Sequence, residues 1–156
     1  MLSRVAERMY WFGRYMERIE NTARLISVNT NLVLDLPRVK HIWSSLISIT
    51  GYEENFSTRF SNQDERNVIK FLLTDERCSI MSSVRLAREN ARTTREIMPR
   101  EAWVKINKLY LHLEKNLPKA LKREGRHQLL SEIVSYCQEL NGYLYSCMSV
   151  NEAYNF

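Results

Sequence analysis

Residues 1–37, MLSRVAERMYWFGRYMERIENTARLISVNTNLVLDLP, decide the fold class of this protein. Apolar or small residues recur along this stretch at alternating spacings of four and three, which places them on one stripe of a helix. The stripe consists of Val5, Met9, Phe12, Met16, Ile19, Ala23, Ile26, Thr30 and Val33. Pro37 should end the helix, because its ring and its missing N–H prevent the helix from continuing. The sequence therefore predicts a first helix that is roughly 45 Å long at about 1.5 Å per residue.

Similar stripes predict helices along the rest of the chain. Residues 39–50 are expected to form a helix with Val39, Ile42, Leu46 and Ile49 facing inward, and residues 52–60 read as a loop. Further helices are expected near 65–74, over 79–98 with a middle of small residues, after Pro99, and after a turn at Glu124-Gly125. Four Gly and three Pro leave little turn chemistry for a sheet. The prediction is one all-α domain over residues 1–156, an antiparallel bundle of about five or six helices.

The composition is that of an ordinary globular protein, with 44% hydrophobic and 26% charged residues. No apolar run is long enough to cross a bilayer, and arginines and glutamates interrupt the N-terminus, so no signal peptide is recognised. Three cysteines without CxxC spacing favour free thiols in a reducing compartment. Cys137 and Cys147 fall on an apolar helical stripe, and both are expected in the core. We therefore expect a cytoplasmic protein.

The common catalytic signatures do not occur in this sequence. There is no GxxxxGK, GxGxxG or GxSxG motif, and the three histidines, His41, His112 and His127, form no HExxH pair. We expect no metal, no cofactor and no self-sufficient catalytic centre.

Two segments instead combine Glu, Asn and Arg in the middle of a predicted helix. We call these residues the polar seam: Arg14, Glu17, Arg18, Asn21 and Arg24 in the first helix, and Arg88, Glu89, Asn90 and Arg92 further on. The simplest expectation is a buried interhelical network, with Glu17 paired to Arg88 or Arg92. The alternative is a site that holds an anionic group or contains an acid/base carboxylate. A distant alternative is nucleic-acid binding by the basic stripe of Arg85, Arg88, Arg92 and Arg95, although glutamates interrupt that face.

The opening residues, MLSRVAERMYWFGRYMER, resemble the start of the alpha-E proteins, a bacterial family named for its helical content and a Glu-Arg motif, here Glu17-Arg18. Residues 87–92, Trp103 and residues 107–110 resemble the second recognisable block of that family. The resemblance implies a partner rather than a reaction: alpha-E proteins are encoded beside, or fused to, circularly permuted ATP-grasp ligases. The chain is accordingly expected to be a non-catalytic helical partner or scaffold of an ATP-grasp-type ligase in a peptide-modification system.

Members of that family are usually about twice as long, so the resemblance implies that this chain corresponds to an N-terminal half. Tyr154 and Phe156 align with Tyr10 and Phe12 at an offset of 144, as though a second repeat began there. Such a chain would leave apolar surface on its last or its first helix uncovered. We therefore expect a homodimer in which a second copy covers that surface.

Overall fold

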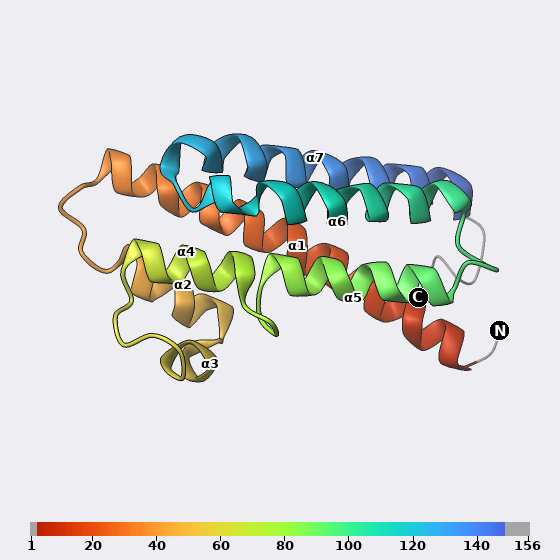
Figure 1. Ribbon diagram of the computed structural model, residues 1–156, viewed down its shortest axis with the longest axis horizontal. Helices are drawn as coiled ribbons and strands as arrows, with labels where there is room; N and C mark the ends of the chain where they lie inside the picture. The colour runs from red at the N-terminus through yellow and green to blue at the C-terminus, as the bar shows by residue number, and fades with distance from the viewer. Residues whose placement is uncertain (1–2, 149–156) are drawn as a thin grey trace.

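The computed structural model describes residues 3–148, and every regular element within them is a helix. These residues form seven helices in chain order (Figure 1): α1 (Ser3–Asp35), α2 (Ile42–Thr50), α3 (Glu53–Ser57), α4 (Glu65–Thr74), α5 (Ile80–Thr93), α6 (Arg100–Ala120) and α7 (Arg123–Met148). The predicted all-α fold with a long first helix is confirmed. The suggested repeat of the opening at Tyr154 and Phe156 lies outside the described residues.

Four of the helices form an antiparallel bundle. Helix α1 packs against α5 and α7, and α6 packs against the same two helices from the other side. Successive members of the set α1, α5, α6 and α7 run in opposite directions (Figure 1). The short helices α2, α3 and α4 lie between α1 and α5 in the chain and gather at one end of the bundle, where α4 continues almost in line into α5 (Figure 1).

The apolar stripe of α1 forms its buried face. Met9, Phe12, Met16, Ile19, Ala23 and Ile26 are all buried. The most extensive contact of α1 is with α5, whose own buried stripe carries alanines at positions 87 and 91. Burial of such apolar surface supplies about 25 cal/mol per Å², and this is the main force that holds the bundle together.

Three details of the prediction are wrong near the α2–α4 end. Residues 53–57 form α3 rather than part of a loop, which adds a seventh helix to the expected five or six. Helix α2 begins at Ile42 and buries Ile42, Trp43, Leu46 and Ile47, so Val39 and Ile49 are exposed. Ile42 and Leu46 are buried as expected, but Trp43 and Ile47 complete the buried face, a difference that a nine-residue apolar stretch cannot reveal by periodicity.

Three further details differ around α5 and α7. Helix α5 ends at Thr93 rather than Met98, although Thr94 and Met98 remain buried as predicted. Gly125 lies inside the first turn of α7, where a Cβ would sit 2.6 Å from the carbonyl oxygen of Lys119. Cys137 is buried, and burial raises the pKa of its thiol to about 12. Cys147 is exposed, contrary to expectation.

Within residues 3–148, none of the helices combines the length and the apolar character that crossing a bilayer requires.

Candidate functional site

The α1 half of the polar seam borders an open groove between α1 and the turn that joins α2 to α3. We call this depression, of about 420 Å³, the α1 groove. One wall is built by Arg14, Glu17, Arg18, Asn21, Thr22 and Leu25, and the other by Ile49, Thr50 and Tyr52. Gly51 shapes the second wall: its φ of 74° is left-handed, ends α2 and turns the chain towards Tyr52.

Arg14 and Glu17 form an ion pair within α1, and this pair lies on the surface. Arg14 Nη1 is 2.6 Å from Glu17 Oε2, and the Glu17 side chain is 61% exposed. A spacing of three residues brings two side chains together on one face of a helix, so the pair forms without help from another helix. Glu17 is therefore not the buried interhelical partner that the sequence suggested.

Arg18 lies beside this pair and is not neutralised by it. Its guanidinium sits 5.8 Å from the centre of the Tyr15 ring, and Tyr15 in turn contacts Trp11 at 5.8 Å between ring centres. No carboxylate among residues 3–148 forms an ion pair with Arg18. The groove consequently contains one guanidinium whose hydrogen-bond donors are free for a ligand.

Asn21 is exposed on the same wall of the α1 groove, but Arg24 belongs elsewhere. Arg24 forms an ion pair with Glu20 at 2.8 Å and borders a different depression, between α1 and α7. Arg24 is thus a residue of the predicted polar seam that does not line the α1 groove.

On α5, Arg88 packs against α6. Its guanidinium lies 4.6 Å from the Tyr110 ring centre and 5.5 Å from that of Trp103, and its Nε donates to Asn107 Oδ1 at 2.7 Å. These contacts bring the two halves of the second family-like block together across the α5–α6 hairpin. Stacking on two rings holds Arg88 in place and leaves it no role in pairing with Glu17.

The neighbouring Glu89 and Arg92 pair with each other. Arg92 Nη2 is 2.6 Å from Glu89 Oε1 on the exposed face of α5, and this hydrogen bond lowers the pKa of Glu89. Asn90 is half-buried, and its carbonyl oxygen accepts hydrogen bonds from Thr93 and Thr94.

The predicted network between the two halves of the seam is therefore wrong, although α1 and α5 are indeed neighbours. Their contact is filled by apolar and small side chains, and Glu17 and Glu89 each pair with an arginine three residues away on the same helix. A direct polar link between the two helices runs instead from Arg8 Nη1 to the carbonyl oxygen of Thr93, at 3.4 Å.

A buried ion-pair network does exist, at the corner where the start of α4 meets the turn between α6 and α7. Arg126 is 2% exposed, and its guanidinium binds Glu65 Oε1 at 2.9 Å, the Ala120 carbonyl at 3.0 Å and the Leu121 carbonyl at 3.2 Å. Arg123 also binds Glu65, and this hydrogen bond is the largest cause that holds the pKa of Glu65 below its usual value. We call Glu65, Arg123 and Arg126, with the carbonyls of Ala120 and Leu121, the Arg126 network. Position 126 lies four residues before Leu130 on the buried stripe of α7, a spacing that could have revealed it.

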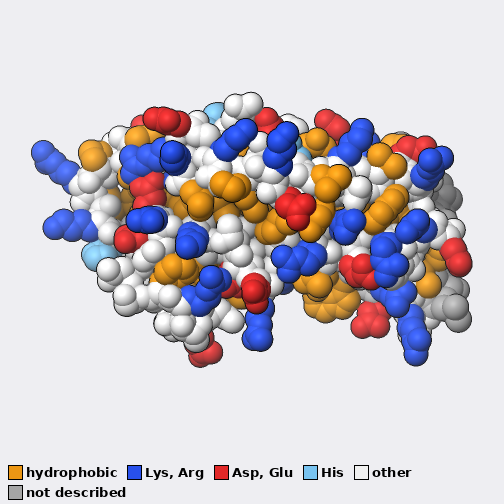
Figure 2. All heavy atoms as spheres, in the orientation of Figure 1, with side chains coloured by type: hydrophobic (Ala, Val, Ile, Leu, Met, Phe, Trp, Pro, Cys, Tyr) orange, Lys and Arg blue, Asp and Glu red, His pale blue; other side chains and the backbone are white. Residues whose placement is uncertain are grey.

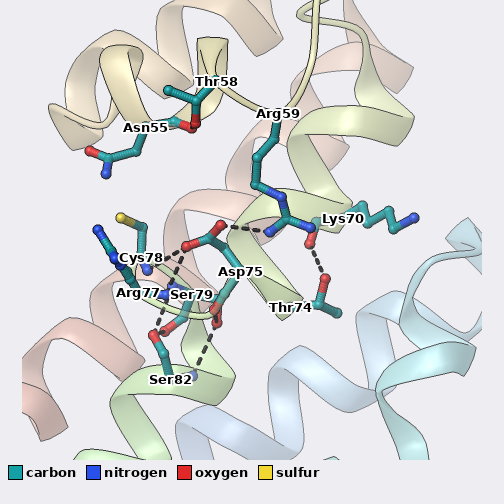
Figure 3. Close-up of polar contacts among 10 residues, drawn as sticks. All are labelled: Asn55, Thr58, Arg59, Lys70, Thr74, Asp75, Arg77, Cys78, Ser79 and Ser82. Atoms are coloured by element: carbon teal, nitrogen blue, oxygen red, sulfur yellow. Dashed lines mark hydrogen bonds and ion pairs between the residues drawn. The ribbon is translucent and has the colours of Figure 1, made fainter.

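A second cluster missed by sequence reasoning holds the junction of α4 and α5 (Figure 3). Arg59 reaches across from the end of α3 to Asp75, with Nη1 2.6 Å from Oδ2, while Asp75 Oδ1 accepts the N–H groups of Arg77 and Cys78. Burial by itself would raise the pKa of Asp75, but these hydrogen bonds outweigh it and the pKa is lowered. Ser79 and Ser82 then form a capping box that starts α5.

Of these arrangements, the α1 groove has the chemistry of a binding site. It offers an unpaired guanidinium, an amide and hydroxyl groups around an open depression, and its one carboxylate is already paired. Guanidinium forks bind carboxylates and phosphates through charge-assisted hydrogen bonds. The Arg126 network and the Asp75 cluster have their hydrogen-bonding groups occupied by the protein itself and serve the fold.

Comparison with known families identifies one match over residues 1–156: Alpha-E, a predicted alpha-helical domain with a conserved ER motif. Neither curated proteins nor solved structures yield a match. The chain contains four Glu-Arg dipeptides, at 7–8, 17–18, 65–66 and 76–77. Glu17-Arg18, in the opening segment that resembles the family, has both of its residues on the α1 groove. With a match over its entire length and an all-helical structure, this chain belongs to the Alpha-E family.

Proposed function

We propose that this Alpha-E protein is a cytoplasmic, non-catalytic helical partner of an ATP-grasp-type ligase in a peptide-modification system. In this role the α1 groove binds an anionic group of the peptide or of the ligase and so brings the two together. The inference that the partner is a ligase rests on the family resemblance of the opening residues. The inference that the bound group is anionic rests on the chemistry of the groove.

The observation that carries the proposal is the position of the Glu17-Arg18 motif on an open groove, with Glu17 exposed and Arg18 half-buried. A surface pair such as Arg14–Glu17 contributes only about 0–1 kcal/mol to stability. The fold therefore has little need of these side chains, and Arg18 has no acidic partner among the described residues. Polar residues that cost the fold nothing and surround a depression are well placed to meet a partner.

One alternative is supported by the same groove. The α1 groove would then act by itself, as a binding or catalytic site that holds an anionic peptide or a phosphate group, with Arg18 as the principal contact. Nucleic-acid binding has weaker support, because Arg88 stacks on α6 and Arg92 is paired with Glu89, so the basic stripe of α5 is largely engaged within the chain.

The test is co-expression of the tagged chain with an ATP-grasp-type ligase of the same organism, followed by affinity purification. We expect the ligase to co-purify with the wild-type chain and to be lost with Arg18→Gln. Arg92→Gln, which removes a more exposed arginine from another helix, should retain the ligase. If Arg18→Gln retains the ligase as well as the control does, the α1 groove is not the contact. If the wild-type chain retains no ligase but binds an acidic peptide, the alternative holds.

We also propose self-association as a homodimer. Leu144 is buried inside the bundle, so the last helix is covered there, but Val28 and Leu32, one turn apart near the end of α1, are exposed. A second copy that covers these side chains would remove apolar surface from water. Sedimentation equilibrium should give twice the mass of 18.6 kDa for the wild-type chain and the monomer mass for a folded Val28→Glu, Leu32→Glu variant. A wild-type monomer at micromolar concentration would contradict the proposal.

A further inference from the structure

A basic cavity of about 510 Å³ lies at the corner where the start of α4 meets the turn between α6 and α7. We call it the basic cavity, and its lining residues are Glu65, Arg66, Lys70, Leu121, Lys122, Arg123 and Arg126. None of them borders the α1 groove. Figure 2 shows Lys and Arg side chains gathered over this end of the molecule.

The charges of the lining do not balance. Five side chains are cationic and one, Glu65, is anionic. Glu65 is already shared between Arg123, whose Nε is 2.8 Å from Oε1, and Arg126 at 2.9 Å. Arg66, Lys70 and Lys122 form no ion pair with any residue in the described part of the chain, 3–148. Three cations therefore face one depression without an anion to neutralise them.

The floor of the basic cavity is fixed rather than adaptable. The buried Arg126 holds the carbonyl oxygens of Ala120 and Leu121, and so fixes the turn that carries Lys122. Glu65, anchored by the same guanidinium, fixes the first turn of α4, which carries Arg66. The two walls are thus tied together by the Arg126 network, so the backbone that carries the free cations is fixed before any ligand arrives. Such preorganisation reduces the entropic cost of binding.

We infer that the basic cavity binds a small multivalent phosphate anion, with Arg66, Lys70 and Lys122 as the contacts that hold it. Three unpaired cations match the charge of a diphosphate or triphosphate group better than that of a single carboxylate. The volume is within the range of small-molecule sites, about 300–1,000 Å³.

The test is titration calorimetry with inorganic tripolyphosphate at fixed ionic strength, on two matched double variants. Arg66→Gln with Lys122→Gln removes two cations of the basic cavity. Arg85→Gln with Lys108→Gln removes one Arg and one Lys that are exposed on α5 and α6, outside the cavity. We expect the cavity variant to lose at least about tenfold in affinity, and the control to change by less than about threefold. Circular dichroism should show both variants folded, since all four side chains are exposed.

Citrate, a multivalent carboxylate, is the comparison ligand. Wild-type chain should bind tripolyphosphate at least about tenfold more tightly than citrate if phosphate is the group recognised. Equal affinity for the two ligands would overturn the assignment to phosphate. Equal weakening of binding in both double variants would show that net charge alone attracts the anion, and no binding to the wild-type chain would refute the site. None of these results bears on the α1 groove, whose residues are unchanged throughout.

Discussion

The α1 groove and the Arg126 network contain the same kinds of side chain, yet they differ in where those side chains find their partners. In the groove, Glu17 pairs with Arg14 on its own helix and both face solvent. In the network, Glu65 of α4 pairs with Arg126 of α7, and the arginine also satisfies two backbone carbonyls. The residue types Glu and Arg do not by themselves indicate which role they have; only the position of Arg126 on the apolar stripe of α7 points to burial.

The difference is one of cost. An ion pair at the surface contributes little to stability, because water stabilises the two separated charges almost as well as they stabilise each other. A buried charge without a partner is strongly destabilising. Side chains of an exposed ion pair can therefore bind a ligand or a partner at little cost to the stability of the fold. Side chains of a buried ion pair are required for the stability of the fold. Three pairs of variants and the single variant Asp75→Asn test this division.

The largest effect is expected at Arg126. Arg126→Met should lower the free energy of unfolding by about 3 kcal/mol, because the carbonyls of Ala120 and Leu121 and one side of Glu65 lose their donor. Urea denaturation measures the loss. Arg14→Met, the equivalent change in the groove, should cost less than about 1 kcal/mol. Equal losses in the two variants would remove the distinction between the two regions.

The next effect concerns the glycines of α7. Gly125→Ala should destabilise by about 2 kcal/mol, because its Cβ would meet the backbone of Lys119 and push apart the turn that the Arg126 network holds. Gly142 has nothing within 4 Å of its Cβ position, so Gly142→Ala should stabilise by about 0.5–1 kcal/mol through helix propensity. Thermal unfolding of both variants decides the point. A stable Gly125→Ala variant would mean that the corner can relax.

A smaller effect, which depends on pH, is expected at Asp75. Its pKa in the folded protein lies below its ordinary value, so ionised Asp75 stabilises the fold above the unfolded-state pKa. This contribution is lost as the pH falls through the folded-state pKa. Asp75→Asn should cost about 1 kcal/mol at neutral pH, where the charge on Arg59 loses its partner, and the deficit should shrink in acid. A deficit that stays constant with pH would assign the loss to packing instead.

The smallest effect on stability is expected at Glu17. Glu17→Gln removes one side of an exposed pair and should change the free energy of unfolding by less than about 0.5 kcal/mol. Glu65→Gln, the same substitution in the Arg126 network, should cost clearly more, because Arg126 is buried. Parallel urea titrations compare the two. A large loss for Glu17→Gln would place the groove among the regions that the fold requires.

Much of the bundle could be predicted because the spacing of apolar residues in each long helix indicates which face is buried. The stripes of α1 and α7 mark the core at Phe12, Ile19, Ile133 and Leu140, and all four are buried. The prediction failed where an element is short. Five residues suffice for α3, and nine for α2, and neither length is enough for an apolar period to fix a boundary or a face.

For the polar residues, the sequence by itself determined which side chains can reach one another within a helix. Spacings of three residues account for Arg14–Glu17 and for Glu89–Arg92. Only the tertiary structure decided that Arg18 stays unpaired at a groove, that Arg88 stacks on Trp103 and Tyr110, and that Glu65 meets Arg126 across 61 residues. The physical reason is the distance along the chain over which each effect acts. Helical periodicity acts over a few residues, whereas the partner of a charged side chain on another helix depends on how the apolar faces pack.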